Sequence, residues 1–352
     1  MSESAEIAGT AVTSVLIITS IVGNSLVCTV IKKNRDMSSH YFSCLGLFKL
    51  KKTLIVMIYF SLSGGIDQQI SVPMNYLLIN LAVADIIYAI FNIPYMVLTH
   101  SSIQPNGATG KLLYTFGTFA WVGAASSVFT LVTVAVERYW SVVHPYGGSR
   151  KRLTMRKLRV LHPGFWLFAL IFEIPIVMFV VCEEKIDFQF CIRVWSHKKD
   201  ILLAFLSTLL ALVVISTTVM FALYFRVVYI LWFRQNNDVN LSHQKRGVLK
   251  VRKRVTLMVI SVSVIFVITW LPDSILHIVV QTTSIELNPF IFPILHIMIM
   301  FNSAVNPFVY ALINQRFKVK IKSMLFPGST SLVSKNSSDL DTQSIELANR
   351  NI

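Results

Sequence analysis

Seven long apolar segments are the feature that most constrains how this chain can fold. About 20 apolar residues are needed for a helix to cross a membrane, and seven segments reach that length. We expect spans at Ile7–Ile31, Met74–Leu98, Leu112–Val136, His162–Val181, Ile201–Trp232, Val255–Val280 and Phe290–Ile313. Only 14% of the residues are charged, against about a quarter in soluble domains. The composition therefore predicts an all-α membrane protein, a seven-transmembrane helix bundle.

Basic residues between the spans predict which ends face the cytoplasm. They cluster at 32–35, 150–159, 243–254 and 316–322, after the first, third, fifth and seventh spans. Since Lys and Arg accumulate on the cytoplasmic side of membrane proteins, we expect the N-terminus outside and the C-terminus inside. The same clusters account for the net charge of +15 without nucleic acid, and we expect none as a partner.

A shorter apolar stretch, "TLIVMIYFSLS", lies between the first and second spans. It is about half a span long, and letting it cross would place the first basic cluster opposite the other three. We expect it in the first cytoplasmic loop, at the membrane interface. That loop has about forty residues, far above the usual connection length.

Six motifs follow one another along the spans in a fixed order. They are Asn24 in "GNSLV", Asp85 in "NLAVAD", "ERY" at 137–139, Trp166, "FVITWLP" at 266–272 and "NSAVNPFVY" at 302–310. Together they resemble the rhodopsin-like (class A) G-protein-coupled receptors, and "MNYLLINLAVAD" and "FRVVYILWF" look most like neuropeptide-type receptors of invertebrates. The resemblance implies a plasma-membrane receptor, not an enzyme, that transmits binding of an extracellular ligand, expected to be a peptide, to heterotrimeric G proteins.

Asp85 is an ionisable residue near the middle of its span, where a charge is costly and marks a functional site by default. In the family, a polar cluster around this acid holds a sodium ion, and oxygen ligands suit a hard cation. The alternative is a set of ordinary polar contacts between helices. No other cofactor is expected. The matching residues here are Asp85, Ser127, Asn302, Ser303 and Asn306, with Asn24 as a further polar partner.

The resemblance also assigns residues to G-protein coupling and to the activation switch. They are Glu137, Arg138, Tyr139, Tyr224, Phe266, Trp270, Pro272, Pro307 and Tyr310. Arg138 is expected to be held in the resting state and released to contact a G protein; the alternative is one more positive-inside arginine. Pro272 and Pro307 remove backbone hydrogen bonds, so their spans can bend there.

Three residues of the last two spans are candidates for ligand binding: Asp273, His277 and His296. An acid in the pocket would suit a cationic ligand group such as a peptide arginine; a polar helix exit is the alternative. Ala120 stands where aminergic receptors carry an aspartate, and Met300 where opsins carry the retinal lysine. Both of those receptor classes are therefore disfavoured.

Two of the departures from the family concern the outer cysteines and the first loop. Leu113 and Tyr114 stand where the family has a cysteine at the outer end of span three, so Cys182 and Cys191 are expected either to pair with each other or to remain free thiols. The segment Ser38–Ser71 is either translated intron or a real insertion. A non-signalling receptor-like protein with a disrupted first loop is therefore an alternative function. A transporter is less favoured, because no internal repeats are evident.

The receptor domain is expected to end with a short amphipathic eighth helix, so that it covers residues 1–326. Phe317, Ile321, Met324 and Leu325 share one helical face, beside Lys318 and Lys322, which is typical of a helix lying on the membrane surface. Residues 327–352 are polar and serine-rich. We expect them to form a disordered cytoplasmic tail.

Overall fold

The computed structural model describes residues 3–32, 73–100, 108–144, 153–181, 198–234, 243–283 and 290–313, with residues 285, 288 and 321. The helices are α1 (Glu3–Lys32), α3 (Pro73–His100), α4 (Ala108–Thr118), α5 (Ala120–Val143), α6 (Met155–Val181), α8 (Lys198–Val228), the π-helix η1 (Tyr229–Arg234), α9 (His243–Thr282) and α10 (Ile291–Ile313).

Seven helical segments are long and apolar enough to cross a membrane. They are Ile7–Ile31, Pro73–Pro94, Leu112–Val143, Met155–Met178, Lys199–Phe233, Leu249–Thr282 and Ile291–Ile313. Each overlaps one predicted span, so the predicted seven-transmembrane bundle is confirmed. The third, fourth and sixth segments run beyond the predicted ends, to Val143, from Met155 and from Leu249, because these helices continue past their most apolar residues.

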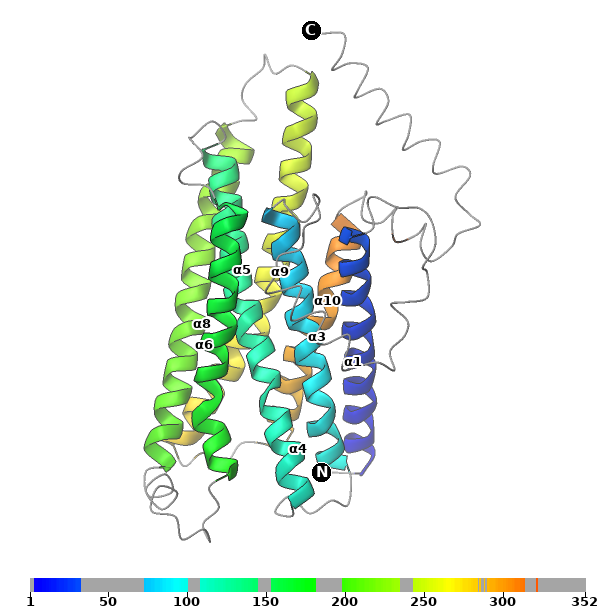
Figure 1. Ribbon diagram of the computed structural model, residues 1–352, viewed down its shortest axis with the longest axis vertical. Coiled ribbons are helices and arrows are strands. Elements are labelled where there is room, and N and C mark those ends of the chain that lie inside the picture. The colour runs from blue at the N-terminus through cyan, green and yellow to red at the C-terminus, as the bar shows by residue number, and fades with distance from the viewer. Residues whose placement is uncertain are drawn as a thin grey trace, which may run out of the picture.

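The helices run up and down in one bundle, with α3 near its middle (Figure 1). α3 packs against α1 and α5, while α10 packs against α1 and α9, and α8 against α5 and α9. Most of the α3 span is buried, whereas most residues of the α6 and α8 spans are not. Large apolar side chains such as Phe221 and Leu312 are exposed, as expected for a surface that lipid would cover.

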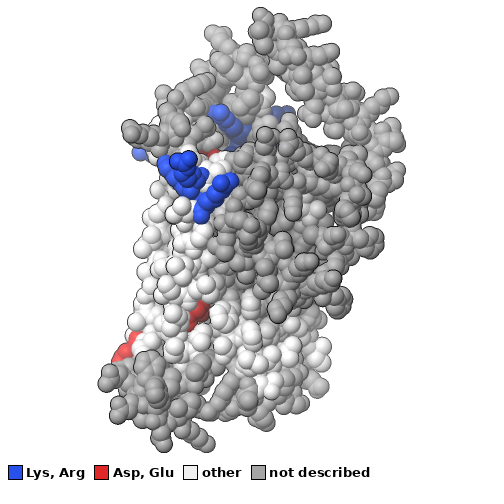
Figure 2. Space-filling model, in the orientation of Figure 1, with Lys and Arg blue, Asp and Glu red and all other residues white. Residues whose placement is uncertain are grey.

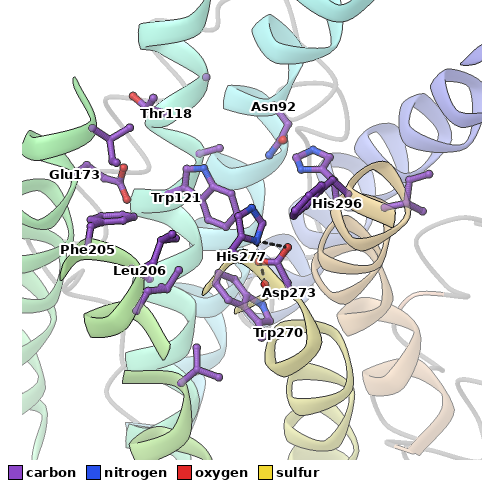
Figure 3. Close-up of a pocket in the computed structure, with 18 of the residues that line it drawn as sticks. Asn92, Thr118, Trp121, Glu173, Phe205, Leu206, Trp270, Asp273, His277 and His296 are labelled. Carbon is purple, nitrogen blue, oxygen red and sulfur yellow. Dashed lines mark hydrogen bonds and ion pairs between the residues drawn. The ribbon is translucent and has the colours of Figure 1, made fainter. Parts of the chain in front are cut away.

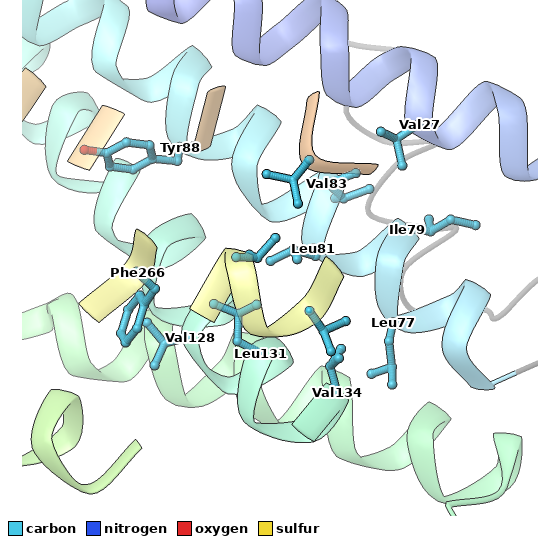
Figure 4. Close-up of a cluster of buried hydrophobic side chains, with 14 of the residues drawn as sticks. Val27, Leu77, Ile79, Leu81, Val83, Tyr88, Val128, Leu131, Val134 and Phe266 are labelled. Atoms are coloured by element: carbon cyan, nitrogen blue, oxygen red, sulfur yellow. The ribbon is translucent and has the colours of Figure 1, made fainter. Parts of the chain in front are cut away.

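Small residues let the central helices approach closely, as is usual in membrane bundles. Gly123 of α5 lies directly against the α3 backbone: a Cβ atom there would sit 2.7 Å from Ala84 O and 2.8 Å from Tyr88 N. Gly23 of α1 lies against the ring of Pro307 in the same way. Leu81, Leu131 and Phe266 belong to the buried hydrophobic core of the bundle and are labelled in Figure 4.

The third span is interrupted at Phe119, between α4 and α5. The Phe119 N–H donates to Phe116 O and the Val122 N–H to Phe119 O, both at 3.2 Å. These three-residue hydrogen bonds make one tight turn that joins the two helices within a single span.

Lys and Arg gather at one end of the bundle (Figure 2). The exposed basic side chains of that end include those at the start of α6, Arg156, Lys157 and Arg159, and Lys250 and Arg254 of α9. α1 ends and α6 and α9 begin at this end, so it is the end to which the predicted basic clusters belong (Figure 1).

Several sequence-based expectations lie outside the described residues. They concern the segment Ser38–Ser71, the pairing of Cys182 with Cys191, the tail 327–352 and most of the expected eighth helix. Within that helix, Ile321 is described: it is helical and packs against the hydrophobic core.

Candidate functional site

A buried polar cluster joins α1, α3 and α10 around Asp85, which is only 1% exposed. The Asn306 side chain donates a 2.6 Å hydrogen bond to Asp85 Oδ2. Asn24 donates to the backbone oxygens of Ser20 and Ser303, both at 3.0 Å. These bonds tie the first, second and last spans together at the level of the intramembrane acid.

Several oxygens of this cluster receive no hydrogen bond from the described part of the chain. They are Asp85 Oδ1, Asn24 Oδ1, Asn302 Oδ1 and Asn306 Oδ1. Ser127 uses its hydroxyl proton on Ala124 O at 2.8 Å, which leaves its lone pairs available. A buried surplus of oxygen acceptors, one of them a carboxylate, has the chemistry that a hard cation or ordered water would satisfy.

At the end of α5 that lies at the basic end of the bundle, Arg138 and Glu137 form an ion pair, in which Arg138 Nε donates to Glu137 Oε2 at 2.6 Å. Both side chains are largely buried. The next residue, Tyr139, packs against Val142, Val227 and Leu231, a small cluster shared with α8 and η1. The arginine is therefore neutralised by its neighbour at the end of its span.

Two of the three tyrosines assigned to coupling and the switch, Tyr224 and Tyr310, are buried. The Tyr224 hydroxyl accepts a 3.3 Å hydrogen bond from Ser263 of α9, which links α8 to α9. Tyr310, near the end of α10, lies in the main hydrophobic core.

The aromatic part of the predicted switch lies deeper in the bundle. Trp270 of α9 packs edge-on against Trp121 of α5, with ring centroids 5.9 Å apart, and lies 5.8 Å from Phe266. Pro272 and Pro307 both lie inside their helices. Pro272 follows Trp270 by two residues, so the possible bend of α9 adjoins the aromatic contact with α5.

A cavity of about 860 Å³ lies on the other side of Trp270, away from the basic end of the bundle. Residues from all eight α-helices that the structure describes, α1, α3, α4, α5, α6, α8, α9 and α10, line it, and some of them are drawn in Figure 3. All three predicted ligand-binding residues, Asp273, His277 and His296, are among them. His277 Nδ1 lies 2.9 Å from Asp273 O and 3.5 Å from Asp273 Oδ1.

Other residues that line the cavity were not predicted from the sequence, among them Asn92, Trp121 and Glu173. Glu173 is only 3% exposed. The sequence did hold a signal for it, because Glu173 is the one acidic residue of the predicted fourth span, and an intramembrane acid marks a functional site by default. The other two are an ordinary amide and an indole, whose positions on their helices carry no such signal.

Residues 56–310 match the family described as 7 transmembrane receptor (rhodopsin family). The chain belongs to this family. The predicted resemblance to rhodopsin-like receptors is therefore confirmed, and the chain is a multi-pass membrane protein of a receptor family. The match begins after α1, yet α1 is part of the bundle, as the contacts of Asn24 and Gly23 with α10 demonstrate.

Curated relatives are similar over most of the receptor. The chain is 25% identical to the allatostatin-A receptor of Bombyx mori over 299 residues, 81% of this chain and 78% of that protein. It is 27% identical to the pyroglutamylated RF-amide peptide receptor of Rattus norvegicus over 263 residues, 69% of this chain and 60% of that protein. It is 24% identical to a QRFP-like peptide receptor of Branchiostoma floridae over 287 residues, 78% of this chain and 73% of that protein.

Proposed function

We propose that this protein is a plasma-membrane receptor that binds a peptide in the cavity beside Trp270 and transmits that binding to a heterotrimeric G protein. One observation carries the proposal: Trp270, Asp273 and His277 all line the cavity and all belong to α9. The same helix extends to the basic end of the bundle. A ligand that contacts this wall therefore acts directly on a helix that reaches the opposite membrane face.

The proposed orientation has the N-terminus outside and the basic end of the bundle in the cytoplasm. The exposed Arg156, Lys157 and Arg159 at the start of α6 support it, because cytoplasmic ends of spans are enriched in Lys and Arg. The cavity then opens toward the extracellular side. The Glu137–Arg138 pair then lies at the cytoplasmic face, where a G protein could reach it.

A peptide is favoured as the ligand by relatives that are named as peptide receptors, those of Rattus norvegicus and Branchiostoma floridae. The volume of about 860 Å³ is within the usual 300–1,000 Å³ of a ligand pocket. It suits a few residues of a peptide rather than a whole one. Asp273 provides a carboxylate for a basic group of that segment.

We also propose a sodium ion at Asp85 in the resting receptor. Asp85, Asn24, Asn302 and Asn306 offer the unpaired oxygens described above, and Ser127 could add its hydroxyl. The ion would offset the charge of the buried Asp85 carboxylate, since its helix, α3, contains no Lys or Arg. It would thereby favour the arrangement in which α1, α3 and α10 surround it.

The test is G-protein activation in cells that express the full chain with an outer epitope tag. Synthetic peptides of the allatostatin-A and RF-amide classes are compared with a panel of biogenic amines. Peptide activation is expected, with loss of signalling in Arg138→Ala at matched surface level. Asp273→Asn should raise the half-maximal peptide concentration roughly tenfold to hundredfold, since a hydrogen bond to a charged group contributes about 1.5–3 kcal/mol.

Asp200→Asn is the matched control, because Asp200 is an exposed acid at the start of α8 that does not line the cavity. Its response should equal that of the unmodified receptor. Activation by amines alone would overturn the peptide assignment, and normal signalling by Arg138→Ala would overturn the coupling assignment.

A further inference from the structure

Glu173 is a buried carboxylate that faces the cavity from α6. It is 3% exposed, and its Oε2 atom has no hydrogen-bond donor in the described part of the chain. In Figure 3 it lies on the opposite side of the cavity from Asp273, with Trp121 and Leu206 between them and Phe205 beside Glu173. The two acids therefore define two separate ends of one cavity.

The described lining of the cavity includes no Lys or Arg that could neutralise Glu173. The basic groups it does include are His277 and His296. His277 is engaged with Asp273, and both histidines are drawn on the Asp273 side of the cavity (Figure 3). Burying an acid inside a membrane without a partner is unfavourable. Such a residue is therefore expected to serve a bound cation.

Aromatic rings surround this end of the cavity. Phe172, next to Glu173 in the chain, stacks on Phe205 of α8 with centroids 4.6 Å apart, and Phe168 stacks on Phe172 at 6.0 Å. All three rings line the cavity. An apolar aromatic wall weakens the screening of a carboxylate by water and can itself attract a cation through its ring faces.

We propose that Glu173 binds a basic group of the ligand, a guanidinium or an ammonium, as a second anchor distinct from Asp273. The cavity then selects a ligand with two separated cationic groups flanking an apolar part, which contacts Trp121 and Leu206. This rests on the proposed function only in taking the cavity as the ligand site. The fourth span thereby gains a part in ligand selection.

The experiment uses a reporter thiol, Thr118→Cys, in the full chain. Thr118 lines the cavity and is drawn on the same side as Glu173 (Figure 3). We compare its reaction rates with a trimethylammonium-ethyl and a sulfonatoethyl methanethiosulfonate reagent, after subtracting the rate of the chain without the reporter. The cationic reagent should react faster, and Glu173→Gln should lower the ratio of the two rates by about tenfold.

Argininamide and citrullinamide then test the ligand chemistry. They have nearly the same shape, but only argininamide carries the guanidinium. Argininamide should slow the labelling of the reporter by an uncharged methanethiosulfonate much more than citrullinamide does. Glu173→Gln should remove that difference, while Glu173→Asp should retain part of it. Asp200→Asn is the control, because this exposed acid does not line the cavity, and it should leave the difference in place. Asp273→Asn is measured alongside it.

Equal protection by the two compounds, or protection that depends on Asp273 but not on Glu173, would overturn the proposal. If Glu173→Gln does not reach the cell surface, the Thr118→Cys chain that keeps Glu173 still decides. In that chain, a ratio of cationic to anionic labelling rates near one would exclude a negative group beside the reporter. These measurements need no G protein. A receptor that fails to signal can still support the inference about Glu173. Normal signalling by Glu173→Gln would contradict this inference and leave the proposed function unaffected.

Discussion

Replacing Gly123 by alanine should destabilise the receptor more than its small size suggests. The new Cβ atom would lie 2.7 Å from Ala84 O and 2.8 Å from Tyr88 N, where ordinary contacts begin at 3.4 Å. The α3 backbone would therefore have to retreat by 0.7 Å, which is 3.4 less 2.7. Both atoms belong to the backbone of a buried helix, so no side chain can rotate away to relieve the contact.

Overpacking a core usually costs about 1–3 kcal/mol, and a contact with two backbone atoms should lie at the upper end, about 2–3 kcal/mol. At 1.4 kcal/mol per factor of ten, the folded population falls at least about thirtyfold relative to the unfolded one. The assay is the heating half-life of detergent-solubilised receptor, followed by fluorescence-detected size exclusion, because unfolding of such a protein is rarely reversible.

Gly164→Ala is the matched control. Gly164 lies in α6, is exposed, and has no neighbouring atom within 4 Å of the place that a Cβ atom would occupy, so its substitution should leave the half-life unchanged or slightly longer. Ala84→Gly should not rescue Gly123→Ala, since the clash is with the backbone oxygen. Equal half-lives for the two alanine variants, or rescue by Ala84→Gly, would refute the close approach of α3 and α5.

Three further predictions concern buried polar groups. Asn80→Ala should lower stability by about 1–3 kcal/mol, because Asn80 donates to Thr130 at 2.7 Å and accepts from Trp166 at 3.2 Å. The heating half-life should shorten, and an unchanged half-life would exclude a structural role for Asn80. Tyr224→Phe should cost no more than about 1 kcal/mol in stability but reduce the maximal G-protein response, and a full response would contradict its assigned role. Asp85→Asn should abolish any effect of replacing sodium by N-methylglucamine on agonist affinity, and a persistent sodium effect would move the ion elsewhere.

The sequence was sufficient for the number and approximate position of the spans, because membrane thickness sets their length. It did not determine how each helix is rotated about its axis. Leu, Ile and Phe occur on all sides of a membrane helix, since lipid is as apolar as the core. That is why the close approach at Gly123 and the contacts of Asn80 with α5 and α6 were not predicted. The turn at Phe119 includes Gly117, but a single Gly is tolerated inside a membrane helix, so it did not predict a break there.

Of the residues that line the cavity, some were predicted from the sequence and Glu173 was not. Asp273 and His277 are one helical turn apart, so they lie on the same face of α9, just beyond Pro272. Because Trp270 points into the bundle, this spacing predicts that both side chains reach the same cavity. His296 was a candidate only from its place on the last span, and α10 brings it to the same cavity. Glu173 needed only the rule that an acid inside a span is rarely idle, applied to the fourth span as it was to Asp85.

The distribution of polar contacts suggests which part of the bundle can move. Hydrogen bonds from Asn24 to Ser303 O and from Asn306 to Asp85, at 3.0 and 2.6 Å, fasten α1, α3 and α10 to one another. α9 instead meets α8 through the longer 3.3 Å bond of Tyr224. It meets α5 through the Trp270 ring and α10 through ring contacts such as that of His277 with Phe292. Ring and aliphatic contacts can slide with little loss, whereas a buried hydrogen bond must break before its partners separate. A ligand on the α9 wall therefore meets the least resistance by displacing α9 and α8 relative to a fixed α1–α3–α10 group, which would carry the change toward the Glu137–Arg138 pair.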